Sequence, residues 1–274
     1  MIVAVDIGAS TTKGVVLSGS RIVHRYLVQT TDALYSASET LEDLFTKVGS
    51  RNRIDQITVS GGGSHKIGGS LLGLPVKKVD EIQAIGLGGL ILTNKRKSLV
   101  VSVGTGTAMV AAYDGGKQIV HVGGTGIGGG TILGLSKRML GIDNYAVLES
   151  MASRGDPDKV DLTVADIVGG PIGIIPANAT ASNFGKLTND ASEEDVAAGI
   201  FSMVSQTVGV VTSMAAKAYD LMDDTILVGL LVKSKIVSKT IAKTTKLFGL
   251  KVHIPKDCEF STAVGAASYI SLFE

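Results

Sequence analysis

Three glycine-rich segments contain residues of the kinds that bind phosphate. Residues 6–13 read DIGASTTK, residues 103–107 read VGTGT, and residues 123–131 read GGTGIGGGT. Glycine makes up 35 of the 274 residues, and its missing Cβ lets a ligand approach the backbone closely. Because backbone N–H groups can bind anions without net positive charge, these segments predict binding of a polyphosphate.

The first segment connects two expected strands, Ile2–Asp6 and Lys13–Leu17. Asp6 ends the first strand and can hold Mg²⁺ directly or through a water, since Mg²⁺ prefers oxygen ligands and keeps several waters. Lys13 can offer a point charge to a phosphate. Taken alone, the segment also fits a hairpin with a polar cap. The residues expected to contact phosphate are Gly8, Ala9, Ser10, Thr11 and Lys13.

The second and third segments have different expected settings. Gly104 and Gly106 lie in a turn between strands, as in the first segment, and Thr105 and Thr107 add hydroxyls. Residues 123–131 open an expected helix, whose unpaired N–H groups and dipole favour an anion. Residues 124–129 fit GxGxxG, but they follow a hairpin in mid-chain, and no acidic residue lies on a following strand about twenty residues later. Both points argue against a dinucleotide-binding fold.

Two carboxylates, Asp80 and Glu81, begin an apolar segment with helical spacing. Acidic residues at a helix start are favoured by the helix dipole, and the spacing alone favours that structural interpretation. The alternative is that one of them acts as a general base toward a substrate hydroxyl.

Composition indicates a globular protein, with 45% hydrophobic and 19% charged residues and a net charge of +1. That charge gives no support for a nucleic-acid or membrane-surface partner. The single cysteine, Cys258, fits a reducing compartment. The N-terminus lacks a signal-peptide pattern, and the apolar stretch Val204–Ala218 is interrupted by polar residues and too short to span a bilayer. We therefore expect a soluble, cytoplasmic protein.

A pattern of strand, glycine turn, strand, turn and strand occurs twice, near residues 2–28 and 99–122. This duplication predicts an α/β fold of two lobes, residues 1–95 and 96–274, with the two turns facing each other across a cleft. The second half is expected to contain a long helix from Ser192 to about Tyr219.

Taken in order along the chain, the motifs resemble those of the type II pantothenate kinases. The quoted segments are DIGASTTK, TVSGGG (58–63), VDEIQAIGLGG (79–89), SVGTGT (102–107), VGGTGIGGGTILGL (122–135), LTVADIVGG (162–170) and ASNFGK (181–186). The resemblance implies the duplicated actin-like ATPase fold, related to ribonuclease H, with a nucleotide cleft between its lobes. It also implies phosphorylation of the primary hydroxyl of pantothenate to 4'-phosphopantothenate, the first step of coenzyme A biosynthesis, with ATP and Mg²⁺.

The resemblance also assigns roles to residues. Glu81 takes the position of the catalytic carboxylate, which replaces the structural interpretation, and Asp6 that of the Mg²⁺ and phosphate loop. The nucleotide contacts implied in addition are Gly104, Gly124, Gly128, Gly129, Gly130, Thr131 and Gly229. The substrate contacts implied are Thr105, Gly106, Thr107, Ala108 and His121. The long helix implies a homodimer, with Ala197, Ala198, Gly199, Ala215 and Ala216 allowing close packing.

Three positions depart from the family pattern. The family usually has Arg where this chain has His121, an acidic residue where it has Gln83, and a polar residue where it has Leu230. A neutral imidazole lacks the bidentate fork of Arg. The sequence therefore leaves open a kinase for a related acceptor, an actin-like ATPase that acts on a partner protein, and a nucleotide-binding regulator that phosphorylates nothing.

Overall fold

The computed structural model describes residues 1–19, 21–49, 54 and 56–273. Its first sheet begins with a meander of β1 (Ile2–Ile7), β2 (Thr11–Ser18) and β3 (Arg21–Gln29). These strands pair antiparallel, and β4 (Ile57–Ser60) adds to the other side of β1 in parallel. The strands β6 (Leu74–Lys78) and β5 (Ser70–Leu71) complete the order β3-β2-β1-β4-β6-β5. The sequence pattern predicts a strand over Ile54–Ser60, whereas β4 begins only at Ile57, and Asp55 lies outside the described residues.

The second sheet repeats this arrangement. The strands β7 (Ser98–Val103), β8 (Thr107–Tyr113) and β9 (Gln118–Thr125) form an antiparallel meander. On the far side of β7 lie β12 (Thr225–Val228) and β13 (Val252–His253), both in parallel, in the order β13-β12-β7-β8-β9. The predicted duplication is therefore present in three dimensions, and the two glycine turns occupy matching places between the first and second strands of each meander.

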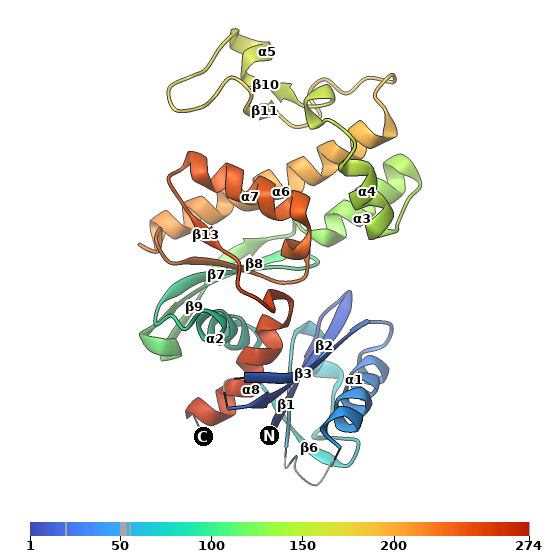
Figure 1. Cartoon of the computed structure of the whole chain (residues 1–274), viewed down its shortest axis with the longest axis vertical. Helices are drawn as coiled ribbons and strands as arrows, with labels where there is room; N and C mark the ends of the chain where they lie inside the picture. The colour runs from blue at the N-terminus through green and yellow to red at the C-terminus, as the bar shows by residue number, and fades with distance from the viewer. Residues whose placement is uncertain (20, 50–53, 55, 274) are drawn as a thin grey trace.

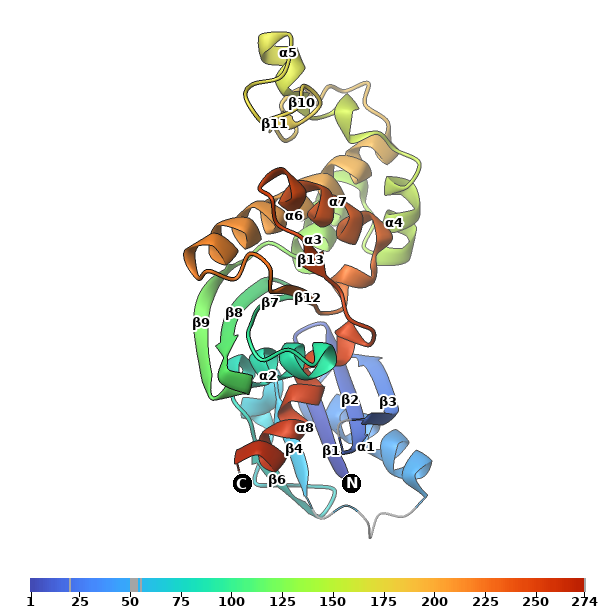
Figure 2. The same cartoon turned by 60° about the vertical axis from the view of Figure 1, so that its left-hand side comes forward.

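Two helices lie between the sheets, α2 (Glu81–Thr93) and α8 (Ser261–Phe273) (Figures 1 and 2). The helix α2 packs on β7, β8 and β9, whereas α8 packs on β1, β2 and β4. The helices approach closely because each has a glycine at the crossing. A Cβ on Gly88 would run into the carbonyl oxygen of Ser261, and a Cβ on Gly265 would run into that of Ala84.

The position of α8 differs from the lobe assignment made from the sequence. The sequence predicts that residues 261–273 belong to the second lobe, but their buried face packs with Ala4, Val15 and Leu17 of the first sheet. In the chain α8 follows β13 of the second sheet, but in space it lies on the first sheet, because the chain returns across the cleft after β13. The division at residues 95 and 96 itself stays a prediction.

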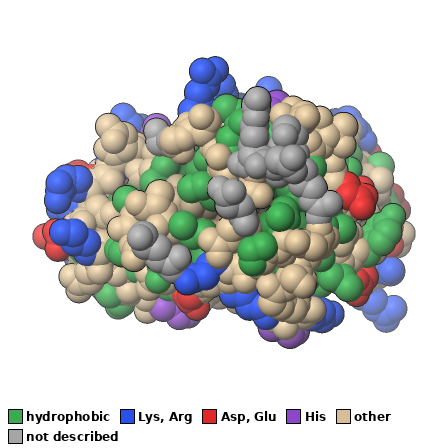
Figure 3. Space-filling view, turned by 90° about the horizontal axis from the view of Figure 1, so that it is seen from below, with side chains coloured by type: hydrophobic (Ala, Val, Ile, Leu, Met, Phe, Trp, Pro, Cys, Tyr) green, Lys and Arg blue, Asp and Glu red, His purple; other side chains and the backbone are tan. Residues whose placement is uncertain are grey.

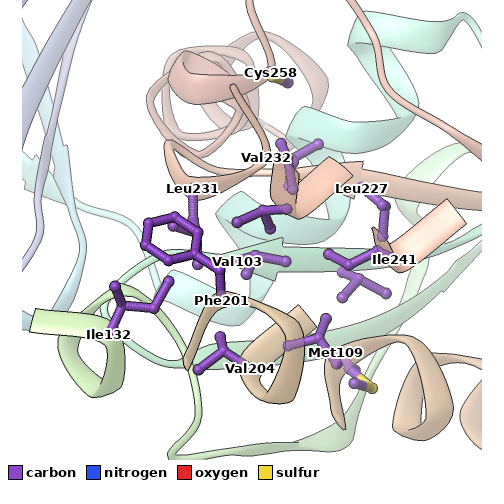
Figure 4. Packing of buried hydrophobic residues seen from close by; sticks show 14 of the residues in the cluster. Val103, Met109, Ile132, Phe201, Val204, Leu227, Leu231, Val232, Ile241 and Cys258 are labelled. Carbon is purple, nitrogen blue, oxygen red and sulfur yellow. The ribbon is translucent and has the colours of Figure 1, made fainter. Parts of the chain in front are cut away.

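The outer faces of both sheets are covered by helices. The helix α1 (Ala33–Val48) packs on the first sheet. The second sheet is covered by α6 (Glu193–Ala218), beside α7 (Lys235–Leu247), α3 (Gly129–Leu140) and α4 (Tyr145–Ala152). Figure 4 shows Phe201 and Val204 of α6 packed with Met109, Ile132 and Leu231 in this core. Apolar burial of this extent is the main force that holds a domain together.

A small excursion projects from the end of the second lobe (Figures 1 and 2). It comprises β10 (Leu162–Thr163), α5 (Val164–Val168) and β11 (Thr180–Ser182). The buried Asp161 ties its base together by accepting hydrogen bonds from the Phe184 N–H at 2.8 Å and the Asn183 amide at 3.1 Å. Asp161 also accepts from the Ser202 hydroxyl of α6 at 3.5 Å. Figure 3 views the molecule from below, at the end opposite to the excursion, and charged side chains of both signs are scattered over that face.

The helix α6 corrects two expectations. Its 26 residues are long and apolar enough to cross a membrane, so the argument from length was wrong, but 72% of its most apolar window is buried inside the molecule. Its small residues also face inward: a Cβ on Gly199 would meet Val160 and Phe184, and Ala197 and Ala216 are fully buried. They therefore pack within one chain rather than against a second one.

Candidate active site

A cavity of about 840 Å³ lies between the two sheets, where the glycine turns of the two meanders meet. A volume of this size is typical of small-molecule sites. Fourteen of the residues singled out from the sequence line it: Asp6, Gly8, Ala9, Ser10, Thr11, Lys13, Glu81, Gly104, Thr105, Gly106, Thr107, Ala108, Gly129 and Gly229. The structure thus brings together both turns and the start of α2.

The first turn is held by hydrogen bonds that leave its outer surface open. The Gly8 N–H donates to the Thr11 carbonyl at 3.1 Å, which closes the turn. Thr30, just after β3, donates its N–H to the Ser10 carbonyl at 3.0 Å and its hydroxyl to the Gly8 carbonyl at 2.9 Å. The carbonyls of the turn are thereby tied back to the sheet, which gives the loop a defined shape before any ligand binds.

Asp6 and Lys13 form an ion pair at the base of the cavity. They are directly opposite each other on β1 and β2, and their charged atoms are 3.4 Å apart. Only 9% of the Asp6 side chain and 11% of the Lys13 side chain are exposed. Gly61 packs against the Asp6 carboxylate, and a Cβ at that position would collide with the Ile7 backbone. Asp6 is therefore a rigid oxygen donor whose direction is set by the sheet.

The two turns touch each other through their hydroxyls. Ser10 Oγ and Thr105 Oγ1 are 2.8 Å apart, although the residues are 95 positions apart in the chain. The second turn is closed by the Gly104 N–H, which donates to the Gly106 carbonyl at 2.8 Å. The hydrogen bond between Ser10 and Thr105 lies between the two turns, so a ligand held by both turns would occupy the same place.

The third glycine segment has a different role from the one expected. The Gly129 N–H donates to the Gly104 carbonyl at 2.8 Å, and the Gly130 N–H donates to the Thr105 carbonyl at 2.9 Å. A Cβ on Gly128 would meet the backbone of that same turn. The first amides of α3 are thus already partnered, so this segment braces the second turn instead of presenting free N–H groups to an anion.

The two carboxylates at the start of α2 have separate functions. Asp80 caps the helix by accepting from the N–H groups of Ile82 at 2.9 Å and Gln83 at 3.1 Å. Within the described part of the chain Glu81 accepts no such bond, and it faces the cavity beside Gly62. A sequence cannot show which of two adjacent acids becomes the cap, because that depends on the backbone angles at the helix start.

The environment of Glu81 shifts its protonation. Burial within the cleft raises the pKa of the Glu81 carboxyl, although the residue keeps exposed surface toward the cavity. The negative charges of Asp6 and Asp80 raise this pKa further, and the Lys13 ammonium opposes them. A carboxyl with a raised pKa is better suited to accept a proton from a hydroxyl near neutral pH.

Five of the singled-out residues do not line the cavity: Gly124, Gly128, Gly130, Thr131 and His121. The four residues from the third segment lie around the brace described above. His121 is exposed on β9, opposite Val110 of β8, two residues along that strand from the cavity-lining Ala108. Its role in substrate binding stays a prediction.

The structure adds lining residues for which the sequence held no motif. They come from residues 143–146, from Leu27 and Gln29 of β3, and from Glu259 and Thr262 near the start of α8. In the first group, Asn144 caps α4 and Tyr145 packs on Phe201 with ring centroids 5.6 Å apart. Burial raises the pKa of Tyr145 to about 12. A cap signal could have located this helix start, but only the fold places it at the cavity.

Comparison with solved structures shows the fold. The activator of 2-hydroxyisocaproyl-CoA dehydratase from Clostridium difficile, with bound ADPNP, aligns over 98% of this chain and 93% of its own, with a TM-score of 0.69 and 18% identity. A ROK hexokinase from Thermus thermophilus aligns over 99% of both chains, with a TM-score of 0.60 and 14% identity. These likenesses show the two-lobe actin-like ATPase and sugar kinase fold.

Sequence comparison shows the family. A family model described as Fumble matches residues 97–267. A type II pantothenate kinase of Bacillus cereus strain G9842 is 30% identical over 215 residues, which are 75% of each chain. Another from Bacillus anthracis is 31% identical over 227 residues, 79% of this chain and 81% of its own. From these matches and the geometry of the cleft, we conclude that the chain belongs to the type II pantothenate kinase family of ATP-dependent kinases.

Proposed function

We propose that the protein transfers the γ-phosphoryl group of ATP to the primary hydroxyl of pantothenate, giving ADP and 4'-phosphopantothenate, the first step of coenzyme A biosynthesis. One observation supports this most directly: Glu81, with a raised pKa, faces the same cavity as both glycine turns. Phosphoryl transfer needs a polyphosphate held in place and a group that orients the acceptor hydroxyl. This cavity contains residues suited to both tasks.

The turns are suited to hold the phosphates. The carbonyls of the first turn are tied back by Thr30, and the Gly8 N–H is bound to the Thr11 carbonyl. The groups proposed to serve the ligand are therefore the other amides of the turn and the Ser10 hydroxyl. The second turn is braced from behind by α3. Rigid donors of this kind stabilise developing charge without reorganising during the reaction. Gly229, with a φ of 98°, lets the segment after β12 approach Val103 beside the second turn.

Asp6 is the residue suited to hold Mg²⁺. Its carboxylate is fixed at the base of the cavity, and no cluster of three or more acidic, His or Cys side chains is found among the described residues. A single protein carboxylate fits Mg²⁺ in phosphoryl transfer, because substrate phosphates and waters complete its coordination. When bound, the ion would neutralise charge on the phosphates.

Glu81 is suited to act on the acceptor. In the proposed step, the hydroxyl oxygen forms a bond to the γ-phosphorus, and the bond from that phosphorus to the ADP oxygen breaks. The hydroxyl proton passes to the Glu81 carboxylate. The residues proposed to orient the acceptor are Thr105, Thr107 and Ala108, which lie on the cavity wall.

We further propose that the protein acts as a homodimer in the cytoplasm. The surface proposed for contact is the outer face of α6. Met214 is 64% exposed there, and Met203, Thr207 and Val210 are partly exposed at helical spacing. A sedimentation measurement on the full chain would test the dimer, and Met214→Glu would be expected to shift it toward monomer.

The central test is ADP release from ATP and Mg²⁺, with and without pantothenate. We expect release to depend on pantothenate and to appear with 4'-phosphopantothenate in equal amounts. Release that is the same without any acceptor would instead favour an ATPase that acts on a partner protein. If other hydroxylated acceptors work and pantothenate does not, the specific assignment is wrong while the kinase chemistry stands.

A further inference from the structure

A fourth run of glycines, residues 61–63, follows β4 at the edge of the cavity. The backbone requires glycine at the first and last of these positions. Gly61 has a φ of 84°, and a Cβ there would collide with the Asp6 carboxylate and the Ile7 backbone. A Cβ on Gly63 would collide with the Ile7 side chain. Packing against β1 therefore accounts for Gly61 and Gly63.

The middle glycine, Gly62, is not required by the fold in this way. It does not adopt a positive φ, so its backbone conformation is open to other residues. Among the described residues outside its immediate chain neighbours, a Cβ built on Gly62 has one atom within 4 Å, Glu81 Oε2 at 3.9 Å. That is an ordinary van der Waals distance. A side chain at this position would thus fit the fold, and it would fill space beside the carboxylate of the proposed base.

The space between Gly62 and Glu81 belongs to the cavity, because both residues line it. Ile85 lines it too, one helical turn after Glu81 on the same face of α2. The acceptor hydroxyl that meets Glu81 would therefore have a bare glycine and an apolar side chain near it. Such surroundings suit an apolar, bulky group next to the hydroxyl, provided that no side chain at position 62 takes up the room.

We propose that Gly62 is a specificity-determining residue that keeps room beside Glu81 for a branched carbon next to the reacting alcohol of the acceptor. The inference rests on the function proposed above and concerns the acceptor in that same site. In pantothenate, the carbon that bears the primary hydroxyl is bonded to a quaternary carbon with methyl groups. When the hydroxyl meets Glu81, those methyl groups must lie close to the same carboxylate. The missing side chain at Gly62 gives them space, and Ile85 offers an apolar contact.

The test combines one variant with two acceptors, pantothenate and an analogue in which hydrogens replace the methyl groups of the quaternary carbon. At saturating ATP and Mg²⁺, we expect Gly62→Ala to lower kcat/KM by about tenfold for pantothenate and by less than about twofold for the unbranched analogue, as the usual discrimination of one methyl-sized group predicts. Equilibrium binding of both compounds beside a non-hydrolysable ATP analogue gives the same comparison if the unbranched compound is not phosphorylated. An equal loss for both acceptors, or an unchanged value for pantothenate, would overturn the proposal.

A matched control separates this role from damage to the fold. Gly68→Ala changes an exposed glycine outside the cavity lining, where the backbone has no positive φ and no described atom lies within 4 Å of the new Cβ. We expect it to alter neither acceptor's kcat/KM. Gly62→Ala should keep the wild-type denaturation midpoint and the wild-type Kd for the ATP analogue, since only Glu81 meets the added methyl group. A lower midpoint or weaker analogue binding would make Gly62 a residue of the fold or of the nucleotide site, and so overturn the proposal.

The outcomes also separate this inference from the function on which it rests. If the wild-type protein phosphorylates pantothenate and Gly62→Ala is unaffected, only the role of Gly62 is wrong. If the wild-type protein phosphorylates neither acceptor, the proposed function is wrong and this inference falls with it.

Discussion

Ser10 Oγ and Thr105 Oγ1 are 2.8 Å apart and join the two glycine turns across the cleft. The bridge connects corresponding points of a duplicated unit, since each hydroxyl lies between the first two strands of its meander. A phosphate held between the turns would replace this contact with bonds from both hydroxyls. If the turns hold the phosphates as proposed, we expect nucleotide binding to break the hydrogen bond between Ser10 and Thr105.

A double-mutant cycle can measure that exchange. Ser10→Ala and Thr105→Val each remove one hydroxyl, and we expect them to couple by about 0.5 kcal/mol in the free energy of unfolding, because the bond is partly solvent-exposed. With a saturating non-hydrolysable ATP analogue, this direct coupling should disappear. Thermal denaturation of the four proteins, with and without the analogue, gives both values. Additive single effects in the ligand-free protein would show that the bridge contributes nothing in solution.

Glu81 and Asp80 allow a matched comparison of two neighbouring acids. Glu81→Gln should reduce kcat by about 10²–10⁴-fold, which is the usual contribution of a general base. Asp80→Asn should retain most activity, since Asn caps a helix about as well as Asp. Initial rates of ADP release from ATP in the presence of pantothenate test both predictions. Full activity in Glu81→Gln would exclude the base role, and equal losses in the two variants would indicate damage to the helix start.

The pH dependence of the rate follows from the raised pKa of Glu81. The base must be ionised, so kcat/KM should rise with pH through this pKa, and the rising limb should lie above the range of an ordinary Glu. Because the Asp80 charge helps to raise the pKa, Asp80→Asn should move the limb to lower pH. Profiles of kcat/KM for both proteins test this. A limb at the same pH in both would show that Asp80 does not act on Glu81.

The tight crossing of α2 and α8 predicts that an alanine at Gly88 lowers the free energy of unfolding, whereas an alanine at a glycine away from the crossing does not. Gly88→Ala should destabilise the protein by about 1–3 kcal/mol, because its Cβ would meet the Ser261 backbone rather than a movable side chain. Gly134→Ala, in the exposed part of α3, has nothing within 4 Å of the new Cβ. It should be neutral or stabilise by up to about 1 kcal/mol through helix propensity. Chemical denaturation curves distinguish the two, and equal effects would argue against a tight crossing.

Several elements were predictable because local patterns determine them. The strands of both meanders lie within a few residues of their expected ranges, and α6 begins after Ser192 as the cap signal indicated. Other bounds depended on backbone geometry. The helix α1 starts at Ala33 because the Asp32 side chain caps it by accepting from the N–H groups of Leu34 and Tyr35. The strand β12 ends at Val228, since Gly229 turns the chain with a φ of 98°.

For the site, too, local patterns predicted some features and not others. The duplicated pattern predicted that the two turns would face each other, and the motifs singled out Glu81. The sequence did not predict that the first amides of α3 bind the second turn, because Gly129 and Gly130 donate to carbonyls more than twenty residues earlier. His121 lies outside the cavity lining because of how β9 pairs with β8. The register of that pairing shifts between Met109 and Val110, which the sequence did not predict.

The sequence by itself determined the repeat and the glycine turns, because turn chemistry and strand alternation act over a few neighbouring residues. The choice of Glu81 as candidate base came from the resemblance to the family, not from these local patterns. Only the tertiary structure decided that Asp80 caps while Glu81 faces the cavity, and that α8 returns to the first sheet. Those properties arise from packing two sheets against a shared pair of helices, which brings into contact side chains that are far apart in the chain.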